Sequence, residues 1–493
     1  MSLCACRSSL VRNSSFFRLP FLGALAACAI IAGCGGGAGT GPTFSGTTAV
    51  TVLASSTAND QLQQYGVSFN SLTLTSQSGK AVNLISSPVG DEFIHLNGTV
   101  EPLATATVPQ GIYDSASVNV STISAACEVQ SAGSLNGNGI VVGVVSTSGT
   151  VKLPGPITIG GTAMGLVLNL QVSQSTPLSG GCPEPSAGGI NTSAVFTLAP
   201  LTIASQPTNS SNGRILGLRG VIAAVAAGGT GMTVNGFSSY NTGYPPAWTV
   251  TLNGSTAFQG VSGASQLQVG AAVDLDATMQ QDGSLLATRV EALNANPANL
   301  GAALTRMVSN YSAGQKMTVL EVQQSGHLPS LFNVYSAGTT TFQVSGQFTN
   351  LQSLPFSATF DASNIVAGQN MFFGSNAADV NGFTPLPTPA TTVTLLPQTI
   401  DGTVSSISGA GGFTTYAVRL ATYDMFPNLA VQPGLTTLLT NPDTVVVYAD
   451  SNTQMLNTSS IAVGSVERFY GLVFNDNGTL RMDCAQVNDG VAE

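Results

Sequence analysis

Charged residues are scarce in this sequence. Only 7% of its 493 residues are charged, against about 25% in an ordinary soluble protein. The 13 Lys and Arg residues are outnumbered by 23 Asp and Glu residues, which gives a formal net charge of −10. Binding to phosphates needs clustered Lys and Arg, and no such cluster occurs here. The composition therefore argues against a nucleic-acid partner.

Histidine is almost missing as well, with two residues in the whole chain. His95 ends an Asp91–His95 run that is typical of a strand, so we interpret it as a structural histidine and predict no metal site. His327 lies in a turn with no neighbouring acid or nucleophile. No Gly-x-Ser-x-Gly motif occurs, and Asp274 and Asp276 alternate with aliphatic residues, as on the solvent face of a hairpin. We expect no enzymatic activity and no cofactor.

Long hydrophobic runs are absent except near the N-terminus. Residues 19–32 form a 14-residue apolar stretch that follows three arginines, which is too short for a permanent span and typical of a signal peptide. The stretch ends in Ile31-Ala-Gly-Cys34. This pattern resembles the bacterial lipobox, which implies a signal peptide over 1–33 and acylation of Cys34. Gly35, where an Asp would favour inner-membrane retention, favours the outer membrane. An ordinary secretory signal is the alternative.

Few of the seven cysteines would remain as thiols in the mature chain. Three lie in the predicted signal peptide and Cys34 carries the lipid, which leaves Cys127, Cys182 and Cys484. Disulfides persist in oxidising compartments outside the cytoplasm. Cys127 and Cys182 lie in the same predicted domain, whereas Cys484 is near the end of the chain. We predict a Cys127–Cys182 bond, with three buried thiols as the alternative.

Short alternating runs of Val, Ile, Leu and Thr dominate the rest of the chain. Val67–Leu74 and Leu166–Val172 are examples, and their period of two predicts half-buried strands. Leu300–Asn310 is the one stretch with helical spacing. The sequence therefore predicts an all-β protein, built of a β-sandwich followed by three small β-barrel repeats.

Changes in composition suggest where the domains begin and end. A Gly/Ser/Thr-rich stretch predicts a flexible tether after Cys34, and a polar stretch over 205–213 predicts a linker. The predicted segments are the tether 34–48, the sandwich 49–204, and the repeats 214–296, 312–398 and 399–490.

The repeats rest on recurring strand patterns. Each copy opens with an aliphatic strand, at Gly220, Met317 and Gly402. An aromatic-x-Val strand follows, with its aromatic residue at Trp248, Phe332 and Tyr416. A common core requires such spacing, so we predict equivalent, buried positions for the three aromatic residues and the same strand order in each copy. Copies one and three close with Asp-Gly and Asn-Gly hairpins, and copy two, which lacks a clear one, should be the most distorted.

Two family resemblances cover most of the mature chain. The N-terminal unit resembles domain-of-unknown-function family 4382 through Phe69–Thr75, Glu92–Gly98 and Pro109–Tyr113, which implies a transthyretin-like or immunoglobulin-like sandwich. The repeats are similar to family 5666, with the pattern Val269–Val290 in copy one. Both resemblances imply a secreted bacterial lipoprotein, and neither supplies a catalytic motif.

One loop is a candidate for ligand binding. Tyr240 and Tyr244 flank Gly243 and could stack against sugar rings. Two functional hypotheses therefore remain open. The first is a lipid-anchored cell-envelope protein with a non-enzymatic structural, adhesion or binding role, whose partners are the membrane and a glycan or another envelope protein. The alternative is a carbohydrate-binding or glycan-processing envelope protein.

Overall fold

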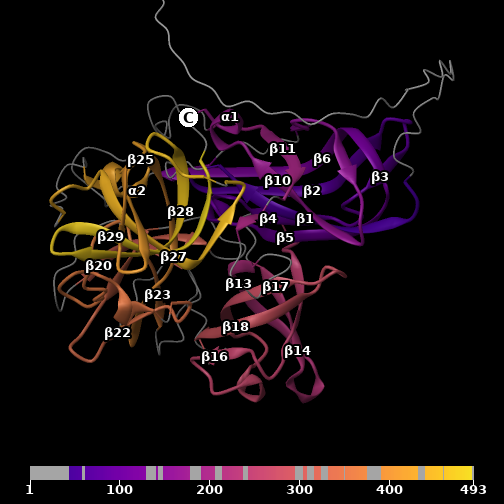
Figure 1. The fold of residues 1–493 in the computed structure, drawn as a ribbon. Helices are drawn as coiled ribbons and strands as arrows, with labels where there is room; N and C mark the ends of the chain where they lie inside the picture. Colours follow the sequence, from indigo (N-terminus) through magenta and orange to yellow (C-terminus); the bar gives the residue numbers. More distant parts are fainter. Residues whose placement is uncertain are drawn as a thin grey trace, which may run out of the picture. The chain divides into compact units, whose positions relative to one another are not determined.

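β-Strands are the dominant secondary structure of the computed structural model (Figure 1). The described residues are 44–57, 62–128, 140–142, 148–177, 190–201, 203–205, 214–236, 243–294, 304–307, 316–323, 331–348, 350–374, 390–430, 439–458 and 460–490. The α-helices in these ranges are short, α1 (Val172–Ser175) and α2 (Met425–Ala430). No helix there is long and apolar enough to cross a bilayer. The all-β prediction is confirmed.

The N-terminal strands form the predicted sandwich (Figure 1, indigo to magenta). One sheet has the order β5-β1-β10-β11-β8; the other has the order β3-β2-β6-β7, with β4 paired to β2 and β9 to β6. Their apolar faces share one core, in which the rings of Phe69, Phe93 and Phe196 lie 5.5–6.1 Å apart. The strands are β1 (Thr47–Ser56), β2 (Leu62–Ser76), β3 (Ala81–Asn83), β4 (Val89–Glu92), β5 (Glu101–Pro109), β6 (Gly111–Glu128), β7 (Ile140–Val142), β8 (Gly149–Lys152), β9 (Ile157–Ile159), β10 (Ala163–Leu170) and β11 (Ala194–Pro200).

The first repeat closes into a five-strand barrel. Its sheet has the order β15-β14-β13-β17-β18-β16, and β15 also pairs with β18, which closes the ring. The β17–β18 hairpin is the one predicted, and Gly283 has the positive φ of 84° that its turn requires. The strands are β13 (Arg214–Val225), β14 (Gly231–Gly236), β15 (Ala247–Thr251), β16 (Ala257–Gln259), β17 (Ala272–Met279) and β18 (Leu285–Asn294).

The other two repeats follow the same strand order. Copy two runs β21-β20-β19-β23-β24-β22, and copy three runs β27-β26-β25-β28-β29. In copy three β27 also pairs with β29, as β15 pairs with β18, whereas the described strands of copy two show no closing pair. The strands are β19 (Leu304–Met307), β20 (Lys316–Gln323), β21 (Leu331–Tyr335), β22 (Thr341–Val344), β23 (Asn370–Gly374), β24 (Thr392–Leu395), β25 (Gln398–Ala410), β26 (Phe413–Leu420), β27 (Thr444–Leu456), β28 (Val466–Asp476) and β29 (Thr479–Asp489).

The register corrects part of the predicted repeat alignment. Trp248 and Phe332 do lie on corresponding third strands, opposite Val234 and Val319. Tyr416 instead lies on the second strand of copy three, opposite Ile407 of the first strand. An apolar-x-Val pattern occurs on second and third strands alike, since both present alternate residues to the barrel core, so the pattern alone could not separate them.

The opening strand of copy two was also misplaced. Met317 lies on the second strand β20, where it pairs with Val334, and so corresponds to Met232 of copy one rather than to Gly220. The first strand is β19, which falls inside the stretch with helical spacing, Leu300–Asn310. Residues 304–307 are nevertheless a strand, because they pair with β20 and β23.

Two strands lie close to predicted domain limits. β1 begins at Thr47, inside the predicted tether. The short strand β12 (Ile203–Ser205), at the end of the predicted sandwich segment, pairs with β27 of the third repeat.

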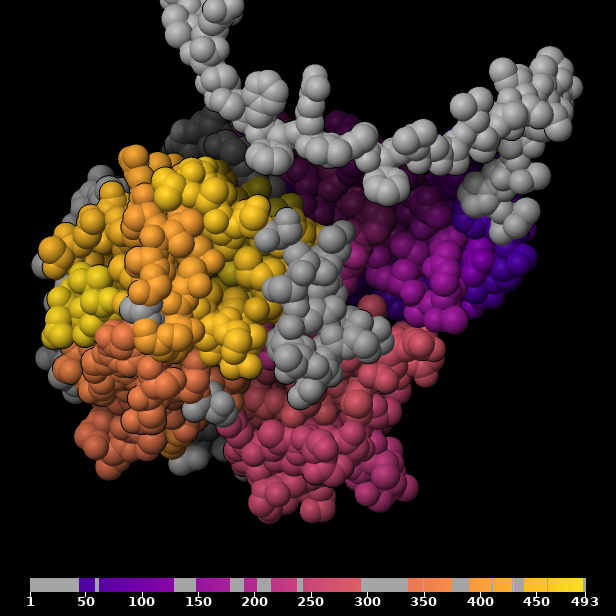
Figure 2. Space-filling model, viewed as in Figure 1, coloured from indigo at the N-terminus to yellow at the C-terminus, as the bar shows by residue number. Residues whose placement is uncertain are grey.

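The hydrophobic core is shared between copies two and three. One cluster joins Phe348 and Met371 of copy two to Leu472 and Phe474 of copy three. In Figure 2 copy two is drawn in orange and copy three in gold to yellow. Residues 44–493 form a single compact unit, so the repeats are not independent domains.

Candidate functional site

A tight turn between β4 and β5 gathers the most unusual polar side chains of the sandwich. β4 ends at Glu92, the 3-10 helix η1 (Ile94–Leu96) follows, and Gly98, with φ of 73°, turns the chain back toward β5. The Glu92 carboxylate accepts hydrogen bonds from the backbone N–H groups of Tyr65, Ile94 and His95, at 2.8–3.1 Å. Glu92 thereby fixes the turn.

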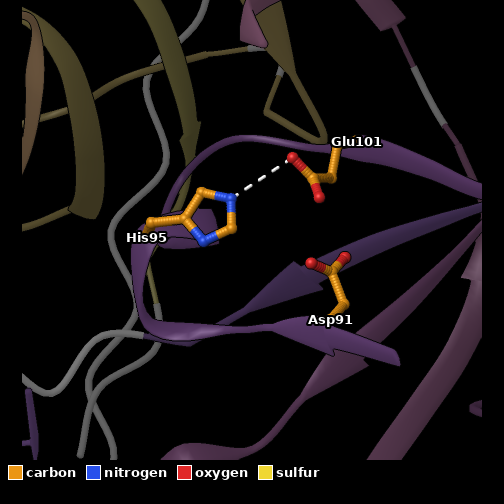
Figure 3. A group of neighbouring side chains, drawn as sticks. All are labelled: Asp91, His95 and Glu101. Atoms are coloured by element: carbon orange, nitrogen blue, oxygen red, sulfur yellow. Dashed lines mark hydrogen bonds and ion pairs between the residues drawn. The ribbon is translucent and has the colours of Figure 1, made fainter. Parts of the chain in front are cut away.

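His95 does not occupy the strand position predicted for it. Since it lies in η1, its ring turns to the same side as Glu92, and Nδ1 lies 3.0 Å from Glu92 Oε2. The other ring nitrogen, Nε2, lies 3.2 Å from Glu101 Oε2 (Figure 3). The chain reversal at Gly98 brings Glu101 back to His95, so this contact depends on tertiary geometry.

Asp91 completes the group. Its side chain is fully buried, one oxygen accepts the Glu92 N–H at 2.8 Å, and the other has no hydrogen-bond partner. Figure 3 shows the Asp91 carboxylate directed toward the space between His95 and Glu101. One ligand atom from each of Asp91, His95 and Glu101 lies within 4.8 Å of the other two. We call these three residues the Asp-His-Glu cluster.

Buried charge strongly shifts the pKa values in the cluster. Burial, and then the neighbouring Glu101 carboxylate, raise the pKa of Asp91 well above its usual range. Burial alone would lower the pKa of His95, but the Glu101 and Glu92 carboxylates outweigh it and raise that pKa to about 9. The cluster can therefore hold protons near neutral pH, or it can ligate a cation through two carboxylates and one imidazole.

Asp274 and Asp276 do not face solvent, contrary to the hairpin interpretation. Both are buried, at 0% and 7% exposure, because the outer face of the β17–β18 hairpin is covered. Arg219 Nε donates to Asp274 at 2.7 Å, and Arg289 bonds Asp274, Asp276 and Glu291. The arginine charges lower the pKa of Asp274 despite its burial. We call these five residues the barrel ion-pair network.

The barrel ion-pair network also joins the first repeat to the other two. Gln347 of copy two donates to Asp276 at 3.2 Å, and Ser345 donates to Glu291 at 3.0 Å. Arg219 donates to the carbonyl of Pro397, just before copy three's first strand. These carboxylates therefore hold the repeats together, and their positions differ from those of an open catalytic pair.

A polar cavity of about 290 Å³ lies where the three repeats meet. Asp276, Asp450 and Asp483 line it, one from copy one and two from copy three. Asn350 Nδ2 donates to both Asp450 and Asp483, at 3.5 and 3.4 Å. Burial, opposed by the Asn350 hydrogen bond, raises the pKa of Asp483 to about 7. The cavity brings these carboxylates together, and Phe348 also lines it.

The predicted site residues are placed as follows. Cys34, Cys182 and Tyr240 lie outside the described residues, so the lipidation and the Cys127–Cys182 bond stay predictions. Cys127 is fully buried on β6, and Cys484 is a buried free thiol. Tyr244 is 61% exposed, as a binding loop requires.

Trp248 is 4% exposed, and its indole N–H donates to the carbonyl of Pro102 at 2.8 Å. Its ring therefore belongs to the core, as the repeat alignment predicted, whereas the Tyr244 side chain is exposed. A cavity of about 340 Å³ lies beside Trp248, lined also by Thr105, Asp282 and Ser284.

Sequence reasoning missed the Asp-His-Glu cluster because its signals were local and weak. The adjacent acids Asp91 and Glu92 before an apolar turn, and Asn97-Gly98 as a reversal signal, would have indicated a turn instead of a strand. Nothing local predicted that Glu101 would return to His95. The barrel ion-pair network was equally hidden, because its arginines come from different strands.

Comparison with known proteins agrees with part of this picture. Residues 219–291, which span most of the first barrel, match a family described as a domain of unknown function, DUF5666. No curated protein matches the chain. The barrel formed by β13–β18 is thus similar to the DUF5666 family.

Proposed function

We propose that this chain is a lipid-anchored protein of the bacterial outer membrane with a non-enzymatic structural, adhesion or binding role. In this proposal the signal peptide 1–33 is removed, Cys34 carries the lipid, and the sandwich, which resembles family 4382, follows a short tether. The sequence pattern Ile31-Ala-Gly-Cys34 supports the anchor.

The way the charged residues are used supports the non-enzymatic role. Charged side chains are rare in this protein, and the barrel ion-pair network uses five of them to fasten one repeat to the others. Buried side-chain hydrogen bonds connect the sandwich to the third repeat, since Asn97 donates to Asp401 at 2.7 Å and Gln486 donates to the carbonyl of Gly98 at 2.7 Å. A unit fixed by such contacts suits a rigid display or scaffolding role.

The anchor is tested by changing Cys34→Ala in the full-length chain. We expect the variant to keep its signal peptide or to leave the membrane fraction, and to lose incorporation of labelled fatty acid. Ser45→Ala, in the segment after the lipidated cysteine, is the matched control and should behave as the wild type. Unchanged fractionation and labelling of Cys34→Ala would refute the proposal.

The disulfide belongs to the same proposal, because it requires an oxidising compartment. A Cys127–Cys182 bond closes a loop of about 55 residues, worth about 4 kcal/mol on the chain-entropy estimate. Peptide mapping without reductant should find these two cysteines linked and Cys484 free. A free Cys127 would contradict the pairing.

Glycan binding is the second candidate, and the exposure of Tyr244 favours it. A 61% exposed tyrosine next to two prolines offers a rigid aromatic face to a sugar ring. A glycan array with the tether-free protein would identify a ligand. Binding should fall with Tyr244→Ala and persist with Tyr244→Phe, which keeps the ring. Equal loss in both variants would point to the hydroxyl group rather than to stacking.

A further inference from the structure

We propose that the Asp-His-Glu cluster is a binding site for a divalent transition-metal ion such as Zn²⁺, with Asp91, His95 and Glu101 as its ligands. The sequence pattern around His95 predicts no metal site, and the proposed site is independent of the lipid anchor. It begins from the charge that the sandwich buries beside η1. Asp91, Glu92 and Glu101 are each at most 3% exposed.

His95 is the cation that pairs with two of these three acids. Within the part of the chain that the structure describes, the ion pairs of Glu92 and Glu101 are both made with His95. A buried excess of negative charge is costly unless a proton or a metal ion neutralises it. One oxygen of Asp91 lacks a hydrogen-bond partner, and the Asp91 carboxylate faces the same space, so this side chain can supply a ligand atom.

The geometry suits one ion. In a tetrahedral zinc site with bonds of about 2.1 Å, ligand atoms lie about 3.4 Å apart. His95 Nε2 and Glu101 Oε2 already lie 3.2 Å apart, and the three candidate ligand atoms lie within 4.8 Å of one another. Small side-chain rotations would therefore bring all three into bonding distance, with the proton between Nε2 and Glu101 released to solvent.

Glu92 orients the imidazole for this role. Metal-bound histidines usually donate their second ring N–H to a carboxylate, which fixes the tautomer and the ring orientation. Nδ1 of His95 lies 3.0 Å from Glu92 Oε2, and the other Glu92 oxygen is held by the N–H groups of Tyr65 and Ile94. With Nδ1 as the donor, the lone pair of Nε2 points toward Glu101.

The ligand set also selects the ion. Imidazole nitrogen is a good ligand for zinc and other first-row transition ions, whereas Ca²⁺ and Mg²⁺ prefer all-oxygen sites. The His95 side chain is 16% exposed, which gives an ion a way in from solvent. The bound ion would brace the turn that carries Asn97 and Gly98, the residues that contact the third repeat.

The test is a zinc titration of the chelator-treated full chain, using calorimetry or competition with a chromophoric chelator. We expect one Zn²⁺ to bind at this site, more tightly than Ca²⁺ or Mg²⁺, and to raise the melting temperature. Asp91→Asn and His95→Gln should each weaken this binding at least tenfold. The chain has two histidines, so His327→Gln is a matched control, as is Asp450→Asn from the carboxylate pair that lacks an imidazole.

Asp91→Asn keeps the test valid if His95→Gln fails to fold. It removes a buried charge while keeping the side-chain shape, so the metal-free variant should be at least as stable as the wild type and yet lose the zinc-induced stabilisation. The proposal is wrong if Asp91→Asn binds zinc as tightly as the wild type, if His327→Gln abolishes binding, if the wild type binds no zinc, or if Ca²⁺ binds more tightly than Zn²⁺.

Discussion

Gly98 shows how one residue connects the candidate metal site to the rest of the chain. Its φ of 73° is unfavourable for any residue with a side chain, and a Cβ there would lie 2.8 Å from Thr399 Cγ2 of the third repeat. We expect Gly98→Ala to destabilise the protein by about 2–3 kcal/mol in urea unfolding. Gly79 has a similar φ of 82° but open space around its Cα, so Gly79→Ala should cost only about 1 kcal/mol. Equal losses would show that the contact with Thr399 is unimportant.

Asp483 gives a prediction about pH. Burial raises its pKa to about 7, above the unfolded value of 3.8, so the folded protein binds an extra proton between about pH 4 and pH 7. The stability contributed by this proton is present at low pH and is lost as the pH rises through 7. Asp483→Asn should therefore be more stable than the wild type at pH 8, by about 2–4 kcal/mol, and nearly equal to it at pH 4.

Urea unfolding at several pH values measures this difference. Asp282 is the control with the opposite sign, because hydrogen bonds from Ser284 lower its pKa. Asp282→Asn should lose stability above about pH 4 and gain none at pH 8. A difference between Asp483→Asn and the wild type that stays constant from pH 4 to pH 8 would rule out titration of Asp483 as its cause.

At the scale of single elements, the sequence predicted the strands well but could not place all of them in the repeat. The Asp-Gly and Asn-Gly turns fixed the hairpins β17–β18 and β28–β29, because these dipeptides accept the positive φ that tight turns need. Strands that expose alternate residues to one core look alike, so Tyr416 was assigned to the wrong strand.

Side chains that meet only in three dimensions were beyond the reach of the sequence. The alternation around Asp274 correctly indicated a strand with one apolar face, but a sequence cannot show that another repeat covers the opposite face. The Asp-His-Glu cluster could not be predicted for a similar reason, since Glu101 reaches His95 only after the chain reversal at Gly98. Local spacing predicts which residues share a face, and tertiary packing decides what covers it.

The hairpin β17–β18 supplies the prediction for an element. Arg289 is 6% exposed and bonds Asp274, Asp276 and Glu291, so removing it leaves three buried carboxylates with insufficient positive charge. We expect Arg289→Met to destabilise the protein by about 3–5 kcal/mol. Arg419→Met, on the exposed face of β26, should change stability by less than about 0.5 kcal/mol. Chemical denaturation of both variants measures the contrast, and similar small losses would show that the network contributes little.

At the scale of the whole molecule, the repeats resemble one another in strand order but do not form separate structural units. β12 pairs with β27 across about 250 residues of chain, and the barrel ion-pair network reaches into copy two. If the repeats were independent domains, each would bury its own core. Here the core of copy two, whose described strands do not close into a ring, includes side chains from copy three.

This shared core predicts that copies two and three unfold together. Phe474 lies on β28 of copy three, is fully buried, and packs in the same cluster as Phe348 and Met371 of copy two. Phe474→Ala should cost about 3–5 kcal/mol, and the loss should reach both copies because the cavity is created in their common core. Hydrogen exchange should therefore quicken for the amides of β23 as well as those of β28.

Val463→Ala is the control, since Val463 is 65% exposed and belongs to the same repeat. It should leave exchange in both strands unchanged. If Phe474→Ala quickens exchange in β28 alone, copy two keeps its core without copy three and the repeats behave as separate domains. If β23 and β28 respond together, the second repeat, whose described strands lack the closing pair seen in the other two, depends on its neighbour for stability. The divergence of copy two would then have a physical cause. Side chains of copy three cover its core, so the strand pair that closes the other two barrels is not needed there.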